Sequence, residues 1–191
     1  GVVAARGNRR GEPVLETMAE FQDVLEKVRA VAMTAGRDVV LVPSRDETTG
    51  ALRLEVCERS GSSPADEGRL QDVLASYTVG REASGAMIAG RSNCYEKALG
   101  GGEDLGKYEI FQHNPYRFAF DNRPFENSMK SLSLKAPTGT FKESYSVLVV
   151  ATSPHGEPIP NGPMGLIVVK ARDFGTSCYY RSNGSSSWKK L

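Results

Sequence analysis

The residues best suited to acid–base or nucleophilic chemistry are few and far apart in the sequence. The chain has two histidines and three cysteines: His113, His155, Cys57, Cys94 and Cys178. Cys94 and His113 together could provide a nucleophile and its base, but no family signature surrounds either residue. We interpret Cys94 as a small buried residue and His113 as a turn residue. We therefore predict no catalytic residues, and a small enzyme of unrecognised type remains an alternative.

Sequence motifs for metals and cofactors are also missing. The cysteines lack the CxxC or Cys/His spacing of zinc sites, and the acidic residues form no DxD or ExxH pattern. Two glycine-rich stretches, residues 80–85 and 100–102, lack the GxGxxG and GxxxxGK[ST] spacings that cradle phosphates. We interpret both stretches as helix ends and close packing. The sequence thus predicts no metal and no cofactor.

One segment has the composition of a binding surface. Residues 111–125 contain five aromatic residues and two arginines. Such residues are enriched in protein interfaces, and aromatics beside arginines can also stack on bases. A third interpretation is that the alternating aromatics form the core face of a strand. The residues we assign to a protein interface are Tyr116, Arg117, Phe118 and Arg123.

The elements that must position these residues begin with a helix expected over residues 13–35. Its apolar residues recur at alternating steps of four and three, the seam of helices packed side by side: Val14, Met18, Phe21, Leu25, Val28, Ala32 and Ala35. Pro13 suits its first turn and Gly36 its C′ position. This seam can pack on the chain's own sheet or contact another subunit. For the second case, the contact residues are Met18, Phe21, Leu25 and Val28.

The next elements are expected to be a β-hairpin and a pair of helices. Residues 38–58 contain two strand-like runs around a turn, and the second run alternates cleanly between apolar and charged residues. Ser63 and Pro64 form a good helix start, and apolar residues then recur at helical spacing up to residue 77. A second, Ala/Gly-rich helix is expected over residues 81–99.

The second half of the chain reads as short strands separated by Pro, Gly and Asn. Residues 146–151 and 166–169 are continuous β-branched runs, which are typical of central strands covered on both faces. The Pro-rich residues 152–163 between them predict a hairpin loop. The fold class is therefore α+β, an N-terminal helix, β-hairpin and helix pair followed by a mostly antiparallel sheet. We expect one domain over residues 13–173, a basic tail over 1–12 and a Ser-rich tail over 174–191.

One stretch carries a family resemblance. Residues 79–82, 86–87 and 93–94 resemble segments of red-algal phycoerythrin-associated linker chains. In that family a cysteine can carry a bilin, and the chain threads through antenna discs. The resemblance implies a linker of a photosynthetic antenna complex, with Cys94 as the chromophore site.

The net charge of the chain narrows the remaining function classes. Twenty-four basic and 23 acidic residues give a net charge of +1, which disfavours a dedicated nucleic-acid protein. The alternative of an RNA-associated, organellar ribosome-type protein uses the basic residues near both ends as phosphate contacts: Arg6, Arg9, Arg10, Lys189 and Lys190. No apolar run approaches the roughly 20 residues that span a bilayer.

Together these observations predict a non-catalytic structural, linker or adaptor subunit of a larger multi-protein assembly. It would bind neighbouring protein subunits through its tails and through the helical and aromatic faces described above. Three widely spaced cysteines do not form the disulfide framework of a small secreted domain, so we expect an intracellular protein. The Arg-rich, acid-free residues 1–11 fit the remnant of a plastid or mitochondrial transit peptide, and equally a plain basic tail.

Overall fold

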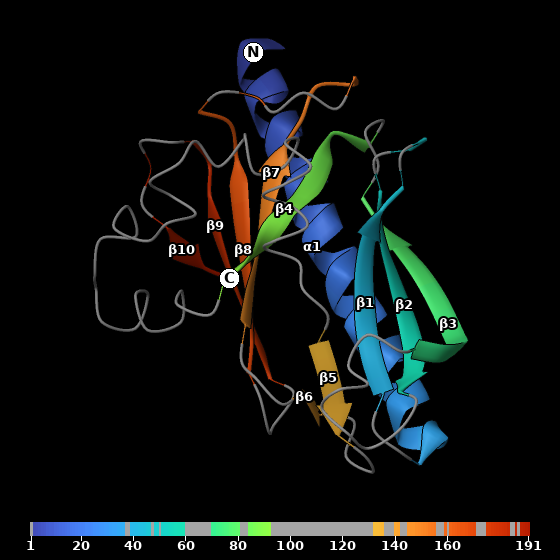
Figure 1. Cartoon of the computed structure of the whole chain (residues 1–191). Coiled ribbons are helices and arrows are strands. Elements are labelled where there is room, and N and C mark those ends of the chain that lie inside the picture. Colours follow the sequence, from blue (N-terminus) through green and yellow to red (C-terminus); the bar gives the residue numbers. More distant parts are fainter. Residues whose placement is uncertain are drawn as a thin grey trace.

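The computed structural model places one helix between two antiparallel sheets (Figure 1). It describes residues 2–36, 39–46, 48–49, 51–59, 70–80, 84–92, 132–135, 140–141, 145–155, 159, 161–170, 175–183, 186 and 188–191. The helix α1 spans Val2–Ala35. It contacts strands of both sheets, so the expected α+β class is confirmed in this coarse form.

Each sheet has five strands, and every pairing is antiparallel. The first has the order β3-β2-β1-β5-β6, with β1 Val39–Arg45, β2 Leu52–Arg59, β3 Leu70–Val79, β5 Leu132–Lys135 and β6 Thr140–Phe141. The second has the order β10-β9-β8-β7-β4, with β4 Ala86–Ser92, β7 Tyr145–Ala151, β8 Met164–Val169, β9 Thr176–Arg181 and β10 Lys189–Lys190.

The helix begins well before Pro13, where we expected it to start. Pro13 lies inside α1 and has no N–H to donate to the carbonyl of Arg9, four residues earlier. Residues 2–12, expected as a tail, are therefore part of the helix. Within the described part of the chain, no helix is both long and apolar enough to cross a membrane.

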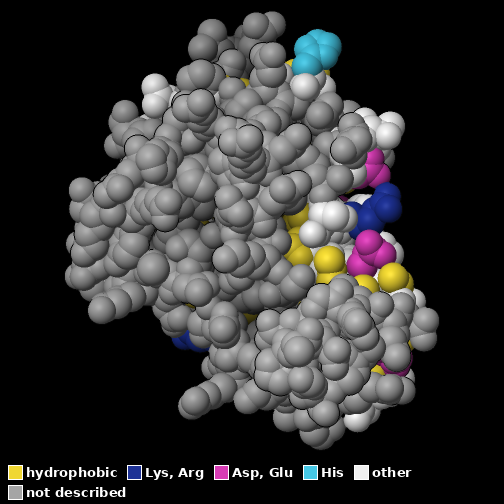
Figure 2. Space-filling model, in the orientation of Figure 1, with side chains coloured by type: hydrophobic (Ala, Val, Ile, Leu, Met, Phe, Trp, Pro, Cys, Tyr) yellow, Lys and Arg dark blue, Asp and Glu magenta, His cyan; other side chains and the backbone are white. Residues whose placement is uncertain are grey.

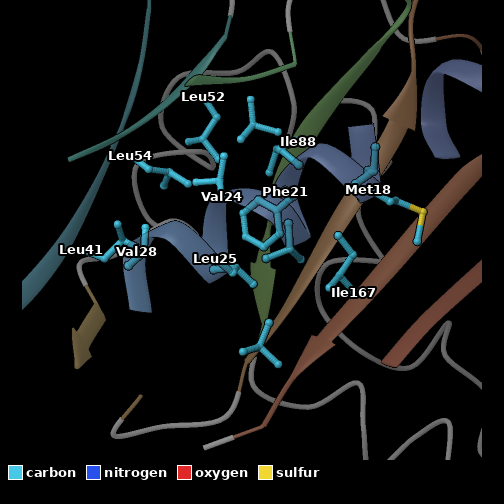
Figure 3. Close-up of a cluster of buried hydrophobic side chains, with 14 of the residues drawn as sticks. Met18, Phe21, Val24, Leu25, Val28, Leu41, Leu52, Leu54, Ile88 and Ile167 are labelled. Carbon is cyan, nitrogen blue, oxygen red and sulfur yellow. The ribbon is translucent and has the colours of Figure 1, made fainter. Parts of the chain in front are cut away.

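The apolar stripe of α1 is buried between the two sheets. Phe21 and Leu25 are 2 % and 1 % exposed, and Figure 3 shows the Phe21 ring at the centre of the cluster. Leu41, Leu52 and Leu54 cover it from the first sheet, and Ile88 and Ile167 from the second. The extra apolar residues beside the seam give the helix a stripe wide enough to face two sheets at once.

Two strand hairpins agree with the sequence prediction. In the first, β1 pairs with β2 in register from Val39↔Glu58 to Arg45↔Leu52. In the second, β7 pairs with β8, and both strands are buried over residues 147–151 and 164–169. In the Pro-rich loop between them, the Ile159 amide donates a hydrogen bond of 3.0 Å to the Ala151 carbonyl, which ties the loop to the end of β7.

The expected helix pair is wrong where the structure describes it. Residues 70–79 form β3 and residues 86–92 form β4. Along β3, Ala75, Tyr77 and Val79 pack against the core while Ser76 and Thr78 are exposed, a period of two that coexists with the helical spacing we followed. The N-cap expected at Ser63 and the end of the second helix lie outside the described residues.

The C-terminal residues, expected as a tail, complete the second sheet. β9 pairs with β8 and β10 with β9. The Leu191 amide also donates to the Cys178 carbonyl at 2.9 Å. The sequence did not predict these strands because the segment is rich in Ser. Its strand-like residues are limited to a short aromatic run, Tyr179 and Tyr180.

Glycines let α1 lie close to the second sheet. A Cβ on Gly165 of β8 would overlap the Met18 sulfur, and one on Gly11 would overlap the Tyr180 hydroxyl. Because these positions carry no side chain, they leave room for the Met18 thioether and the Tyr180 hydroxyl at the helix–sheet contact.

We predict that Gly165→Ala lowers the free energy of unfolding by about 1–3 kcal/mol, because the added methyl overpacks the helix–sheet contact. Urea denaturation measures this change. In a double-mutant cycle with Met18→Ala, the double variant should lose less unfolding free energy than the sum of the two single losses. Removing the thioether makes room for the methyl. Full additivity would contradict the contact.

The turn between β1 and β2 is held by a carboxylate. Asp46 Oδ1 accepts hydrogen bonds from the backbone amides of Thr48 at 2.9 Å and Thr49 at 3.0 Å. Its Oδ2 lies 3.0 Å from Arg53 Nη2. The Thr49 and Thr48 amides, followed by the Arg53 charge, lower the pKa of Asp46 below its ordinary value of 3.8.

This lowered pKa predicts a specific acid dependence of stability. The Asp46 carboxylate stabilises the fold fully above pH 3.8, and this contribution is lost as the pH falls through its lower folded-state pKa. Asp46→Asn should therefore flatten the curve of unfolding free energy against pH below pH 3.8. Arg53→Gln should retain most of that slope, because the backbone bonds outweigh the ion pair. An unchanged slope in Asp46→Asn would refute the assignment.

Candidate functional site

The helix residues predicted to contact another subunit lie inside this chain. Met18, Phe21, Leu25 and Val28 each expose 2 % or less of their surface. They pack against both sheets within one cluster. In this conformation they offer no surface to a partner, so the search for a binding site moves to the ends and edges of the elements.

The structure describes only some of the other predicted site residues. Tyr116, Arg117, Phe118 and Arg123 lie outside the described residues, as do Cys94 and His113. Arg6, Arg9 and Arg10 belong to the first turns of α1, and Lys189 and Lys190 form the exposed strand β10. The structure thus buries the helical face within the chain, and the aromatic face stays a prediction.

An apolar groove lies where the end of α1 meets β2 and β3. We call it the α1–β3 groove, and it has a volume of about 380 Å³. Its walls are Ala30, Val31, Thr34 and Ala35 of α1, Glu58 of β2 and Leu74 of β3. Leu74 is 39 % exposed. This volume is within the range of small ligand sites and side-chain pockets.

An irregularity in β3 creates the groove. Val56 of β2 pairs with Ala75, but the next residue, Cys57, pairs with Val73, so Leu74 is an extra residue in the ladder. Such a β-bulge bends the strand and turns one side chain away from its regular direction. Leu74 thereby lines the groove beside Val31 and Ala35, while Val73 is 54 % exposed. The sequence signal for the bulge was the adjacent pair Val73 and Leu74. In a regular strand, neighbouring side chains point to opposite faces, so both cannot be buried on one face.

One acidic side chain lines the groove. Glu58 contributes a carboxylate to its wall, and the C-terminal end of the α1 dipole lies beside it. The last turn of α1 contains no basic residue, and Gly36 ends the helix in the left-handed region with φ 69°. A ligand that fits would combine an apolar group with a positive charge.

The adjoining strand edge provides a second means of contact. Among the described residues, β3 pairs only with β2, and it is the end strand of its sheet. An end strand presents backbone N–H and C=O groups that can pair with another extended segment. Figure 2 shows hydrophobic side chains beside acidic and basic ones where described residues reach the surface.

The reactive side chains that the structure describes do not gather into a site. No group of three His, Cys, Asp or Glu side chains among them could hold a metal ion. Burial raises the pKa of Cys57, with a further contribution from Glu55, and burial raises the pKa of Cys178. Both thiols are therefore largely protonated at neutral pH, which is their less reactive form. His155 is exposed in the loop after β7.

No family model, curated protein or solved structure matches this chain. The likeness to antenna linkers therefore stays a prediction, and its chromophore residue, Cys94, lies outside the described residues. The function has to be argued from the surfaces of this molecule itself.

We expect Cys57 and Cys178 to react slowly with iodoacetamide in the folded protein, because their raised pKa values reduce the thiolate fraction. Peptide mass spectrometry after timed labelling at pH 7.5 reports each cysteine separately, with urea-unfolded protein as the reference. Reaction at the unfolded rate would contradict the protected, protonated state.

Proposed function

We propose that this protein is a non-catalytic adaptor or structural subunit of a multi-protein assembly. In this proposal the α1–β3 groove holds an extended segment of a neighbouring subunit. The observation that carries it is the open apolar groove beside an end strand, lined by the bulged Leu74 and the last turn of α1. Exposed apolar surface of this kind is characteristic of partner-binding sites.

The proposed partner segment adds to the sheet as a strand. Backbone pairing along β3 would give it affinity, and the groove would select one of its side chains. Successive side chains of a strand point to opposite faces. One apolar side chain would therefore enter the groove beside Leu74, while its neighbours in sequence would face away, toward the side of exposed Val73.

Charge complementarity defines the rest of the segment. Glu58 and the C-terminal end of α1 make the groove negative, so a Lys or Arg of the partner near the apolar anchor would be favoured. An acidic residue at the same place would be rejected. The occupant is therefore a basic, apolar extended segment of another protein.

The test begins by identifying the segment. A photo-crosslinking amino acid at position 73, beside the groove, should link to one defined peptide of a partner in cells that make this protein. The same amino acid at Leu15, on the exposed side of α1 and 38 % accessible, is the control. The peptide found should carry an apolar residue next to Lys or Arg.

We predict that Leu74→Asp weakens binding of the synthetic partner peptide at least 30-fold, because it places a charge in an apolar anchor site. Leu15→Asp should leave the Kd unchanged, since Leu15 and Leu74 are about equally exposed and only Leu74 lines the groove. Fluorescence anisotropy measures both constants, and circular dichroism checks the fold. A peptide variant with Glu in place of its basic residue should also bind more weakly.

Two results would refute the proposal. One is equal peptide binding by the Leu74→Asp and Leu15→Asp variants. The other is that the native protein is monomeric in the cell and its groove crosslinks to no protein.

A further inference from the structure

One flank of α1 lies along β3, the end strand of the first sheet. A Cβ on Gly80, the residue after β3, would lie 3.5 Å from Thr17 Cγ2 of the helix. Toward the other end of the strand, Leu74 lines the α1–β3 groove together with Ala30. β3 therefore runs beside α1 in the opposite direction, from the groove toward the N-terminal half of the helix.

The flank of α1 beyond β3 is exposed and carries a net negative charge. Residues three or four apart are neighbours on a helix, so Glu20 is a neighbour of Thr17, and Glu16 is a neighbour of Glu20. Both glutamates are exposed. Closer to the groove, Lys27 Nζ lies 3.0 Å from Asp23 Oδ2, so these two charges offset each other. Glu16 and Glu20 supply the net charge of the flank.

Glu16 and Glu20 repel each other. Like charges at i, i+4 destabilise a helix, and neither glutamate has a Lys or Arg three or four residues away in the sequence. A guanidinium or ammonium group between the two carboxylates would remove this repulsion. The pair therefore favours a cation that comes from outside the helix.

We infer that the partner segment in the α1–β3 groove continues along β3 and places a Lys or Arg between Glu16 and Glu20. This inference rests on the proposed function and adds a second, charged contact to it. A strand added beside β3 lies about 4.8 Å beyond it. The side chains of that strand that are level with Ala75 and Tyr77, which pack toward the core, would face the same flank of α1.

The axial distances define the spacing of the segment. Glu20 and Glu16 precede Ala30, a wall of the groove, by about 15 Å and 21 Å along the helix. A strand covers these distances in about four and six residues, and both numbers are even, so the side chains share the face of the apolar anchor. The position two residues from the anchor would face the neutral pair of Asp23 and Lys27.

The direction of the segment follows from strand pairing. Every pairing among the described strands is antiparallel, and antiparallel pairs are slightly more stable per residue than parallel ones. A segment antiparallel to β3 runs from Glu16 toward the groove. Its basic residue would therefore come about four to six residues before the apolar anchor.

The first experiment selects twelve-residue peptides from a random phage-displayed library on the full chain, with a parallel selection on the Leu74→Asp variant. Peptides enriched only on the unaltered chain should carry Lys or Arg four or six residues before an apolar residue. A reversed order, with the apolar residue first, would overturn the inferred direction.

The second experiment measures the Kd of a selected peptide by fluorescence anisotropy. Glu20→Gln should weaken binding about 1.5- to 5-fold, the effect of losing one exposed ion pair. The matched control is Glu26→Gln, which removes the same charge from an exposed site about 120° around the helix from Glu20. It should leave the Kd unchanged, and circular dichroism verifies that both variants fold.

A charge swap identifies the contact directly. A peptide with Glu in place of its basic residue should bind the Glu20→Arg variant more tightly than it binds the unaltered chain. The original peptide should show the opposite order, since its cation would then face Arg.

The outcomes separate this inference from the proposed function. Equal Kd values for Glu20→Gln and Glu26→Gln, with binding still lost in Leu74→Asp, would overturn the inference and leave the groove in place. A selection that enriches the same peptides on the unaltered chain and on Leu74→Asp would refute the groove, and the inference with it.

Discussion

The structure depends on the burial of one face of α1 between two antiparallel sheets. Phe21 at the centre of this contact touches the inner faces of both sheets through the same cluster. Burial of each such side chain contributes about 1.5–3 kcal/mol, and α1 contacts strands of both sheets. It cannot be withdrawn to bind a partner without opening both sheets.

Because the core occupies the apolar face of the helix, the binding surface that we propose lies at an end of the helix. At the C-terminal end, the bulge at Leu74 leaves a negative apolar groove that the first sheet does not fill. At the N-terminal end, the Gly11–Tyr180 contact joins α1 to β9 of the second sheet. In the proposed function, the groove would hold a segment of a neighbouring subunit, as a subunit that connects components of an assembly requires.

Sequence patterns predicted the structure correctly where the residues fit a strand and could not also fit an amphipathic helix. The continuous runs of β7 and β8 admit no amphipathic helix, and they form buried, adjacent strands. Residues 70–79 satisfy both helical and strand periods, and the choice of strand came from pairing with β2, a contact that no local pattern contains. The Ser-rich residues after 174 became strands for the same reason, since β8 supplied an edge for β9.

By itself, the sequence determined the α+β class, the opening helix with its apolar stripe, and the hairpins β1–β2 and β7–β8, because their patterns are local. Only the tertiary structure decided that the stripe of α1 is covered by the chain's own sheets, since its spacing also fits a contact between subunits and the outcome depends on which surface arrives to cover it. Tertiary structure also decided the candidate sites. The groove needs the bulge that the β2–β3 register imposes on Leu74, and the close approach of α1 to the second sheet needs Gly11 and Tyr180, more than 150 residues apart, to meet. No local spacing can encode such meetings, because they are fixed by how the sheets close around the helix.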